Sequence, residues 1–390
     1  MTINNEHKKL NVPNLRFKEF EGEWDKCELG EFATIIGGYA FKSETLNSIG
    51  GKYQVVKMGN LYQNQLDLHR SPSYTDTLTH KAENVILQKD DIAITLTGTN
   101  NKRDFGYTYI FNDEKNLLLN QRCGLIRAKG NPYFLSCLLK THTFLNQFFE
   151  SATGGTGNQA NVSTKAMEMF SVNTPSLKEQ EKIGQLMALL DERIATQNKI
   201  IEDLKKLKSA ISENLFKAVK GDVVILSEIC EIIKGKQVNS EFLSEKGKYY
   251  VMNGGTEPSG YYSDYNVEAN TISISEGGNS CGYIQFNTSP FWSGGHCYTI
   301  QKIADNVDHL YLYHYLKTKE DAIMKLRIGS GLPNIQKKGL AMFKIKLPNV
   351  EQQKSISTFL SSLERKAEIE EIIQNAMLKE KQYLLQQMFI

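Results

Sequence analysis

An internal repeat of one long amphipathic segment constrains most strongly how this 390-residue chain can fold. Residues 175–216 and 348–389 align without a gap, at a constant offset of 173 positions from Pro175 to Pro348. Apolar residues recur three and four positions apart in both copies, which is typical of a long helix that buries one seam against another helix. Proline is tolerated at a helix start. The repeat therefore predicts two long helices that pair antiparallel within one chain.

The predicted seam runs the length of each copy. At a rise of 1.5 Å per residue, about 40 residues form a rod of roughly 60 Å. Two solvated amphipathic helices, each packed on a separate core, remain the alternative interpretation. The predicted seam residues are Ile183, Leu186, Leu190, Ile194, Ile201, Leu204, Ile211 and Leu215 in the first copy and Ile356, Phe359, Leu363, Ala367, Met377, Leu384 and Met388 in the second.

The repeat extends upstream of the two helices. Residues 161–170 match residues 334–343 at the same offset of 173, and the segment that begins at Leu29 matches the one that begins at Leu226 at an offset of 197. The first globular part is therefore about 24 residues longer than the second. Between these matches the two halves diverge, as expected of two domains that share a scaffold but recognise different targets.

These features predict an α+β fold with two tandem β-rich domains, each followed by a long helix, and the two helices pair as an antiparallel coiled coil. The expected segments are an N-terminal arm at 1–20, a first domain at 21–173, a first helical segment at 174–220, a second domain at 221–346 and a second helical segment at 347–390.

Local patterns predict elements inside the two domains. Short β-rich runs are bounded by Gly, Asn and Asp. Lys220-Gly221-Asp222 is expected to end the first long helix at its glycine. The predicted strands lie at 53–58, 91–96, 270–275 and 282–286, and further helices are predicted at 132–149 and 307–326.

Composition excludes several classes of protein. With 40% hydrophobic and 23% charged residues and a net charge of +2, the chain resembles neither a disordered nor a fibrous protein. No apolar run approaches the ~20 residues of a membrane helix, and the N-terminus lacks the apolar core of a signal peptide, so a cytoplasmic location is expected. The six cysteines form no CxxC pair, which indicates reduced structural thiols and no zinc site.

The residues that flank the helices resemble those of a known family. Gly331-Leu332-Pro333-Asn334-Ile335 leads to Pro348 and Glu351-Gln352-Gln353-Lys354, and Asn161-Val162-Ser163 leads to Pro175 and Glu179-Gln180-Glu181-Lys182-Ile183. This duplicated order is similar to that of the specificity subunit of type I restriction-modification systems (HsdS), over nearly the whole chain. Residues 12–17 also resemble the first segment of many such subunits. The two copies depart from the family pattern in one loop only. There Ser163 aligns with Gln336, and Gln159-Ala160 aligns with Leu332-Pro333.

The resemblance implies a sequence-specific DNA-binding subunit without catalytic activity. Each domain would read one half of a bipartite, asymmetric site in double-stranded DNA, and the helices would set the spacer. Two methyltransferase subunits would dock on the helical segments, and two restriction subunits would join them. The seam residues named above, except Ala367, are the predicted subunit interface. S-adenosylmethionine, ATP and Mg are expected on these partners and no cofactor on this chain. Because a target adenine must leave the base stack, distortion of the DNA is expected.

The residues themselves point to DNA contacts less directly, because phosphate binding needs local rather than global positive charge. Loops that combine cations, amides and aromatics are the candidates, since Arg pairs with guanine and Asn or Gln with adenine. An ordinary solvated turn remains the alternative for each loop. The candidates are Thr97, Thr99, Asn100, Asn101, Lys102, Arg103, Gln121 and Arg122 in the first domain, and Lys234, Lys236, Gln237, Asn253, Asn279, Ser280, Trp292 and His296 in the second, where the loops include 276–280.

Several enzyme-like patterns have simpler interpretations. Asn131-Pro132-Tyr133-Phe134 partly matches an adenine methyltransferase loop, but a helix start explains it better. The glycines at 153–157 and 277–279 lack the Gly-Lys-Ser/Thr ending of a phosphate loop and are interpreted as turns. His296-Cys297 is interpreted as a packed pair rather than a thiol nucleophile. The histidines show no metal-binding spacing, so no metal is predicted.

Two functions from other classes stay open. The chain could be a coiled-coil scaffold that joins two protein-binding β-rich domains without binding DNA, or a self-sufficient nuclease or methyltransferase. The apolar surface of the helices also predicts that the isolated chain is unstable or prone to aggregation without methyltransferase partners.

Overall fold

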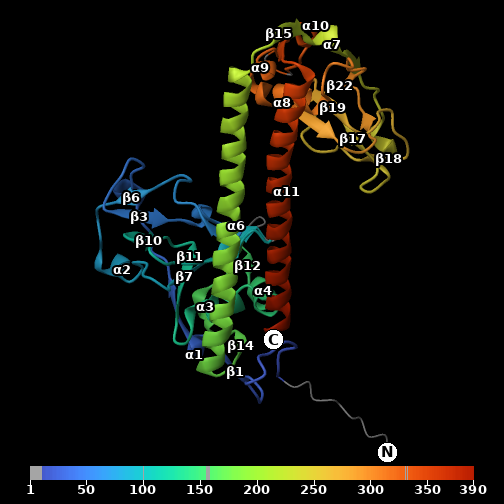
Figure 1. Ribbon diagram of the computed structural model, residues 1–390. Coiled ribbons are helices and arrows are strands. Elements are labelled where there is room, and N and C mark those ends of the chain that lie inside the picture. Colours follow the sequence, from blue (N-terminus) through green and yellow to red (C-terminus); the bar gives the residue numbers. More distant parts are fainter. Residues whose placement is uncertain (1–10, 100, 155–158, 330, 332) are drawn as a thin grey trace, which may run out of the picture. The chain divides into compact units, whose positions relative to one another are not determined.

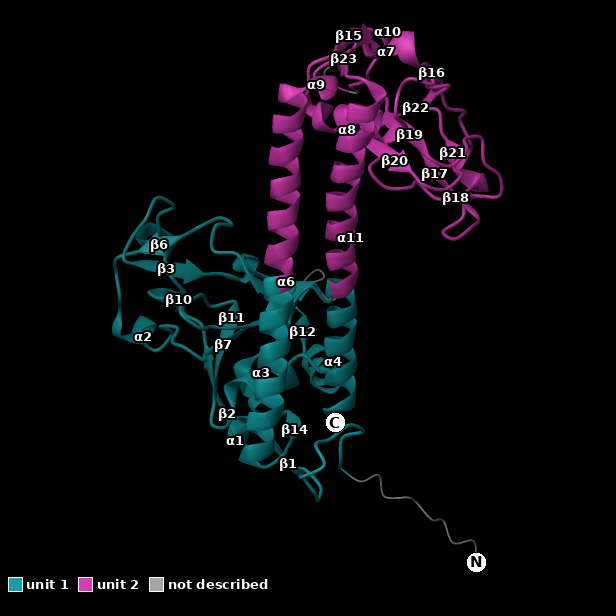
Figure 2. Ribbon diagram, viewed as in Figure 1, with its two compact units in different colours: residues 1–196, 374–390 teal, residues 197–373 magenta. Residues whose placement is uncertain are grey.

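The computed structural model describes residues 11–99, 101–154, 159–329, 331 and 333–390, and the chain divides into two compact units (Figure 2). Unit 1 contains residues 1–196 and 374–390, and unit 2 contains residues 197–373. The predicted class is confirmed: two β-rich parts are each followed by one long helix (Figure 1). The sequence boundaries give each helix a segment of its own, whereas the contacts divide each helix between the two units.

Unit 1 is built on a four-stranded antiparallel sheet in the order β2-β11-β7-β9. One apolar core joins this sheet to the helices α3, α4 and α6 and to the end of the chain at Met388 and Phe389. Smaller sheets in the orders β10-β3-β6, β12-β13-β8, β1-β14 and β4-β5 complete the unit. Its elements are β1 (Asp25–Glu28), α1 (Leu29–Phe32), β2 (Ala33–Gly37), β3 (Tyr53–Val56), β4 (Leu61–Tyr62), β5 (Gln65–Leu66), β6 (Tyr74–Thr75), α2 (His80–Glu83), β7 (Ile92–Thr95), β8 (Thr97–Thr99), β9 (Thr108–Ile110), β10 (Leu117–Leu119), β11 (Cys123–Ala128), α3 (Pro132–Leu138), α4 (His142–Glu150), β12 (Thr153–Gly154), β13 (Gln159–Asn161), α5 (Thr164–Glu168), β14 (Ser171–Thr174) and the first half of α6 (Leu177–Ala218).

Unit 2 repeats this plan around the antiparallel sheet β16-β22-β19-β20. The sheets β18-β17-β21 and β15-β23 correspond to β6-β3-β10 and β1-β14 of unit 1. A second apolar core lies between the sheet, α8 and the long helices. The elements are β15 (Asp222–Ile225), α7 (Leu226–Ile229), β16 (Glu231–Lys234), β17 (Tyr249–Met252), β18 (Tyr261–Tyr262), β19 (Thr271–Ser275), β20 (Ile284–Asn287), β21 (Trp292–Ser293), β22 (Cys297–Gln301), α8 (His309–Thr318), α9 (Glu320–Met324), α10 (Lys337–Ala341), β23 (Lys344–Leu347) and α11 (Val350–Gln387).

The same backbone hydrogen bonds recur in both units, which establishes residue-by-residue equivalence between them. The offset between equivalent residues falls from 196 at Val56 and Met252 to 180 at Thr95 and Ser275. Sixteen of the extra residues of unit 1 therefore lie between Val56 and Thr95, in the part that holds the β4–β5 hairpin and α2. The recurring donor–acceptor pairs include Leu29 to Phe170 and Leu226 to Phe343, Gly38 to Cys123 and Gly235 to Cys297, and Leu96 to Arg122 and Glu276 to His296.

Helices α6 and α11 pair antiparallel, as predicted. In unit 2, Gln197 Nε2 donates to Glu370 Oε2 (2.6 Å) and Lys208 Nζ donates to Glu364 Oε1 (2.5 Å). In unit 1, Lys381 forms an ion pair with Asp191. Asp191 and Glu364 are equivalent in the repeat, as are Lys208 and Lys381, because both pairs are 173 positions apart. One carboxylate–lysine pair of the repeat is therefore used twice, and separate solvated helices are excluded.

The seam differs from its prediction at Phe359. That side chain is 46% exposed, whereas Leu360 is fully buried. The seam on α11 is formed by Ile356, Leu360 and Leu363, at spacings of four and three residues. Because Phe359 lies outside this heptad register, its side chain faces solvent. The seam also carries the polar residues described above, which an apolar pattern does not reveal. Ile183, Ile194, Ile201, Ile356, Ala367, Met377 and Met388 are buried, and Leu186, Leu190, Leu204, Ile211, Leu215, Leu363 and Leu384 are half-buried.

A glutamine anchors the first turn of each long helix. Gln180 Nε2 donates to the carbonyl oxygen of Pro175 (2.8 Å), and its Oε1 accepts the backbone N–H of Asn131 (3.2 Å). Gln353 Nε2 donates to the carbonyl oxygen of Pro348 (2.9 Å), and its Oε1 accepts the backbone N–H of Asp308 (2.8 Å). Both glutamines are buried, and they are equivalent in the repeat. Each ties its helix to the cap of a helix in the adjoining β-rich part.

Three expected elements are corrected. The helix predicted at 132–149 is two helices, α3 and α4, because Thr141 caps the second by accepting the N–H of Phe144 (3.3 Å). The helix predicted at 307–326 likewise ends at Thr318, and α9 follows. Helix α6 ends at Ala218, so Gly221 is no helix cap. A Cβ at Gly221 would overlap the carbonyl oxygen of Leu347, so close packing on β23 requires glycine there.

The described part of the predicted N-terminal arm, residues 11–20, packs on unit 1. Leu15 N–H donates to the carbonyl oxygen of Gln387 (2.9 Å) at the end of α11. Arg16 Nε donates to Glu179 Oε1 (2.7 Å) at the start of α6, and this hydrogen bond raises the pKa of the guanidinium. The arm thus contacts both long helices. Within the described residues, no helix is long and apolar enough to cross a membrane.

Candidate nucleic-acid interface

The candidate site of unit 2 lies where three strands of the sheet β16-β22-β19 end at one edge. Because neighbouring strands are antiparallel, the last residue of β16, the residues after β19 and those before β22 meet there. Together with the loop after β17 they surround a hollow of about 540 Å³. The hollow is lined by Lys234, Asn253, Gly254, Gly255, Glu276, Gly277, Gly278, His296, Pro333 and Asn334.

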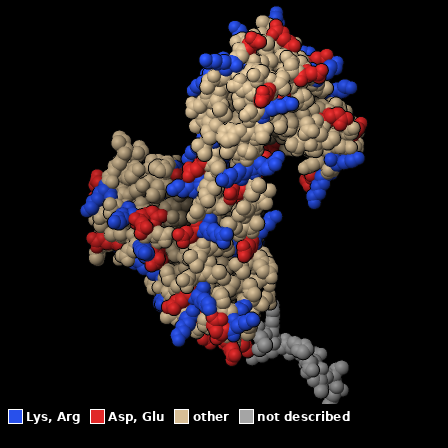
Figure 3. All heavy atoms as spheres, viewed as in Figure 1, with Lys and Arg blue, Asp and Glu red and all other residues tan. Residues whose placement is uncertain are grey.

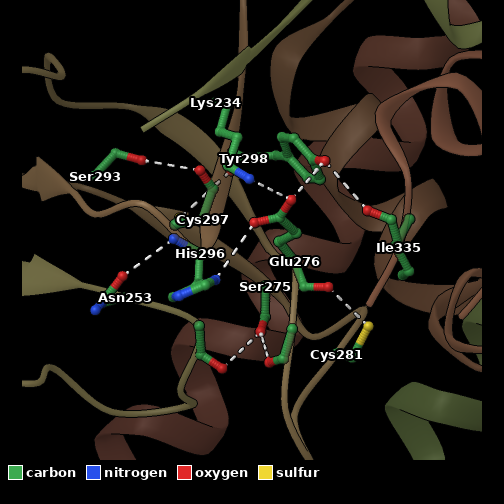
Figure 4. Close-up of polar contacts among 12 residues, drawn as sticks. Lys234, Asn253, Ser275, Glu276, Cys281, Ser293, His296, Cys297, Tyr298 and Ile335 are labelled. Carbon is green, nitrogen blue, oxygen red and sulfur yellow. Dashed lines mark hydrogen bonds and ion pairs between the residues drawn. The ribbon is translucent and has the colours of Figure 1, made fainter. Parts of the chain in front are cut away.

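Glu276 is the charged group at the base of this hollow. The residue is only 8% exposed. Its Oε1 accepts hydrogen bonds from Lys234 Nζ (2.6 Å) and from the hydroxyl of Tyr298 (3.0 Å). Its Oε2 has no hydrogen-bond partner among the described residues and lies 3.6 Å from His296 Nδ1 (Figure 4). Burial, together with the hydrogen bond to Glu276, raises the pKa of Tyr298 to about 12, so this hydroxyl stays a donor. A buried carboxylate is tolerated because it is paired.

The backbone around Glu276 is fixed by further hydrogen bonds. The N–H of Glu276 donates to the carbonyl oxygen of His296 (2.9 Å), and the N–H of His296 donates to Asn253 Oδ1 (3.1 Å). The hydroxyl of Ser275 donates to the carbonyl oxygen of Gly254 (2.6 Å) (Figure 4). Gly254 has a φ of +84°, which favours glycine. The loops that carry the polar side chains are therefore held to one another.

Only part of this cluster is accessible. The side chains of Lys234 and His296 are 51% and 63% exposed, and that of Glu276 is 11% exposed. The hollow therefore presents the ammonium of Lys234, which is a hydrogen-bond donor, and the imidazole of His296, with a carboxylate beside them. In the part of the chain that the structure describes, no three His, Cys, Asp or Glu residues are grouped as metal ligands would be.

The equivalent place in unit 1 has the same backbone but uncharged residues. Leu96 replaces Glu276 and is 5% exposed. By the strand register, Gly37 replaces Lys234, and Gly124 replaces Tyr298. A Cβ at Gly124 would lie 3.4 Å from Leu96 Cδ2, so the leucine fills the space that the tyrosine and carboxylate occupy in unit 2. His296 has an exposed arginine, Arg122, as its equivalent.

The candidate residues of unit 1 fall into two groups. Thr97 is buried, and its hydroxyl donates to Asn161 Oδ1 (3.0 Å), while the hydroxyl of Thr99 donates to Asp104 Oδ2 (3.4 Å), so both side chains support the fold. The exposed group is formed by Asn101, Lys102, Arg103, Gln121 and Arg122. The guanidinium of Arg103 stacks 5.0 Å from the ring of Phe149. Asn100 lies outside the described residues.

In unit 2 the structure brings Lys234, Asn253 and His296 together in the hollow. Trp292 Nε1 donates to the carbonyl oxygen of Lys236 (2.8 Å), so this tryptophan holds a loop in place. The remaining candidates lie outside the hollow: Lys236, Gln237 and Asn279 are exposed, and Ser280 is half-buried. DNA contact stays a prediction for every candidate in both units.

Sequence reasoning missed the partners that organise the site. The loop predicted at 276–280 includes Glu276 without giving it a role, and Tyr298 is not among the candidate residues. The interpretation of His296-Cys297 as a packed pair is right for Cys297, which is 2% exposed, and wrong for His296. Burial raises the pKa of the Cys297 thiol to about 11, which leaves it a poor nucleophile. Every cysteine is free, and five of the six are buried.

The methyltransferase-like sequence at Asn131 is a helix start, as predicted. Asn131 Oδ1 accepts the N–H of Phe134 (2.8 Å), and Pro132 occupies the first turn of α3. Gly277 and Gly278 line the hollow, and part of the loop at 153–157 lies outside the described residues.

The long helices carry exposed apolar side chains as well as buried ones. Ile369, Ile372 and Ile373 lie within about one turn of α11 and are 49%, 67% and 39% exposed. The apolar pattern did not single them out, because they lie beside the seam. In the view of Figure 3, acidic and basic side chains are interspersed over the surface of each unit, in agreement with the net charge of +2.

Comparison with known proteins gives a consistent result. The family model of the type I restriction modification DNA specificity domain matches residues 21–206 and again residues 219–379. The type I restriction enzyme MjaVIII specificity subunit of Methanocaldococcus jannaschii is 24% identical over 90% of this chain and 90% of its own length.

Solved structures agree in fold. The crystal structure of a type I restriction-modification S subunit from M. genitalium superposes with a TM-score of 0.67 over 97% of this chain and 99% of that one, at 19% identity. A chain from a study of complex assembly and conformational transition of the type I R-M system gives a TM-score of 0.56 at 17% identity, over 93% of this chain and 96% of that one.

Proposed function

The chain belongs to the family of type I restriction-modification DNA specificity subunits, and from this premise we propose that each unit reads one half of a bipartite, asymmetric DNA site. The observation that supports this proposal most is the comparison of the two strand edges. The backbone hydrogen bonds are the same, while Glu276 and Lys234 in unit 2 stand where unit 1 has Leu96 and Gly37. Two readers of different half-sites need this combination of a shared frame and different side chains.

We propose that the helix pair sets the spacing between the half-sites. Two readers on a stiff connection meet DNA at a fixed separation, in steps related to the ~34 Å helical turn. Helices α6 and α11 are continuous over 42 and 38 residues. The polar seam pairs support the proposal, because specific polar pairs between helices favour one register over others.

The same helices are proposed to dock two methyltransferase subunits, with two restriction subunits in the full complex. Exposed Ile369, Ile372 and Ile373 are apolar side chains available for such an interface. The seam residues predicted for docking are mostly engaged within this chain, and Phe359 is the member most available to a partner. S-adenosylmethionine, ATP and Mg are proposed to bind the partners, and this chain is proposed to be a recognition subunit without catalysis of its own.

The proposal is tested by mapping adenine methylation across the genome of cells that carry this gene with its methyltransferase, with and without deletion of this gene alone. We expect one bipartite motif to lose methylation on deletion. An unchanged methylation pattern, combined with failure of the chain and its methyltransferase to bind duplex DNA, would instead favour a coiled-coil scaffold without a role in DNA recognition.

A further inference from the structure

Building on the function proposed above, we propose that the ammonium of Lys234 reads the acceptor edge of a guanine, that Glu276 positions this ammonium, and that His296 lies against the same base. Lys234 and His296 line the same hollow from different strands, and both are more than half exposed. They are therefore the charged or ionisable side chains of the hollow that a base edge can reach.

Glu276 holds the ammonium of Lys234 and lies close to the ring of His296. One carboxylate oxygen accepts from Lys234 Nζ at 2.6 Å, and the other lies 3.6 Å from His296 Nδ1. Tyr298 shares the first oxygen and fixes the orientation of the carboxylate. An unrestrained lysine is a mobile point charge, whereas a lysine bound to a buried carboxylate keeps one position before DNA arrives. Such preorganisation favours directional recognition.

The donor character of the hollow selects among the bases. In the major groove, guanine presents two acceptors, N7 and O6, and lysine recognises this edge in many complexes. Adenine and cytosine each present an amino donor that would face the ammonium of Lys234, and thymine presents a single acceptor beside a methyl group. Lys234 therefore matches guanine best.

A backbone phosphate is the competing acceptor on DNA, and the geometry disfavours it. The carboxylate of Glu276 lies directly beside the ammonium of Lys234 and offsets its charge, which weakens attraction to an anion more than a hydrogen bond to a neutral base. Unit 1 has Leu96 and Gly37 at the equivalent positions, so the guanine preference belongs to one half-site only.

The test uses the full chain in complex with its methyltransferase subunits. Methylation motifs are mapped in cells, and binding is measured on duplexes that carry each base pair at each position of the site. In Lys234→Ala we expect one G·C pair of a single half-site to lose about 5- to 150-fold of its discrimination, the range of one good base contact. Lys234→Arg should keep guanine at that position, because arginine reads the same edge.

Glu276→Gln tests the positioning role. The amide still accepts from Lys234 but carries no charge to hold the ammonium, so we expect relaxed recognition at the same single position. Lys325→Ala removes an exposed lysine of unit 2 outside the hollow and should leave the motif unchanged. Urea unfolding of each variant, followed by tryptophan emission, establishes that unit 2 remains folded.

Three results would overturn the inference while leaving the proposed function intact. One is uniform weakening across all sequences by a variant that urea unfolding shows to be folded, which is the result of losing a phosphate contact. Another is a wild-type motif in which the half-site affected by Lys234→Ala has no G·C pair at the relaxed position. The third is a Glu276→Gln motif identical to that of the wild type. If the wild-type complex methylates no bipartite motif, the proposed function fails and the inference fails with it.

Discussion

Units 1 and 2 are alike where they hold the long helices and different where their central sheets end. At the helices, equivalent residues make equivalent contacts: Gln180 and Gln353 each bind the proline that precedes their helix. At the sheet edge, equivalent backbone carries Leu96 in one unit and Glu276 in the other. The two units thus share the contacts that hold the long helices, whereas the edges of their central sheets carry side chains of different chemistry.

The difference at the sheet edge can be tested by placing the residue of unit 2 at the equivalent position of unit 1. We expect this substitution, Leu96→Glu, to have the largest effect on stability. Unit 1 has glycines where unit 2 has the lysine and tyrosine that pair with Glu276, so the new carboxylate would be buried without partners. We expect a loss of about 3–5 kcal/mol in the unfolding free energy, the cost of an unpaired buried charge. Urea unfolding followed by the emission of Trp24, in a Trp292→Phe background, reports on unit 1.

Leu96→Met is the matched control, since a volume-conserving apolar exchange usually costs less than about 1.5 kcal/mol. If Leu96→Glu were as stable as Leu96→Met, the edge of unit 1 would tolerate charge, and the contrast with Glu276 would carry no structural meaning.

The second-largest difference between the two units is expected in how the unfolding free energy of each depends on pH. His314 on α8 is buried, hydrogen-bonds to Ser361 (2.9 Å), and has its pKa lowered to about 4, chiefly by burial. The neutral form is therefore favoured in the folded state, so stability is retained above the ordinary histidine pKa of about 6.5 and lost as the pH falls toward 4. At pH 5 we expect a loss of about 2 kcal/mol relative to pH 7.5.

The emission of Trp292 in a Trp24→Phe background follows this loss in unit 2. Asn131 and Asp308, which make equivalent contacts with Gln180 and Gln353, are 177 positions apart, and by this offset the residue of unit 1 equivalent to His314 is Cys137. Burial raises the pKa of the Cys137 thiol to about 11, so it does not titrate in this range. His314→Gln should remove most of the pH dependence. A loss of the same size in that variant would assign the effect to other groups.

The polar contacts of the long helices should contribute similarly to the unfolding free energy in both units. Asp191 accepts from the hydroxyl of Tyr133 (2.5 Å) and pairs with Lys381, and Glu364 accepts from the hydroxyl of Tyr313 (3.1 Å) and from Lys208 (2.5 Å). Asp191→Ala and Glu364→Ala should each cost about 1.5–3 kcal/mol, because each leaves a tyrosine and a lysine without an acceptor. Hydrogen exchange of the flanking helical amides measures both. Costs that differ by more than about twofold would contradict a duplicated contact.

The sequence predicted the repeat, the fold class and the antiparallel helices, because periodicity and matched anchors extend over many residues. It did not predict the polar seam contacts, since Gln197 and Glu370 interrupt an apolar pattern without changing its period. Of the candidates predicted in unit 2, the structure brings Lys234, Asn253 and His296 together, but the sequence did not identify Glu276 as the residue between them. Which side chains meet at a sheet edge depends on strand register, and register depends on long-range pairing that local propensity does not encode.

Arg122 and His296 occupy equivalent positions. Replacing them is expected to have the smallest effect on stability and the most specific effect on DNA recognition. Both side chains are exposed, so replacing either with alanine should change the unfolding free energy by less than about 0.5 kcal/mol. If each unit reads its own half-site, Arg122→Ala should relax one half of the methylated motif and His296→Ala the other. Methylome mapping of both variants tests this directly. Relaxation of the same half by both variants would contradict the division of labour, because equivalent positions of two independent readers cannot contact one half-site.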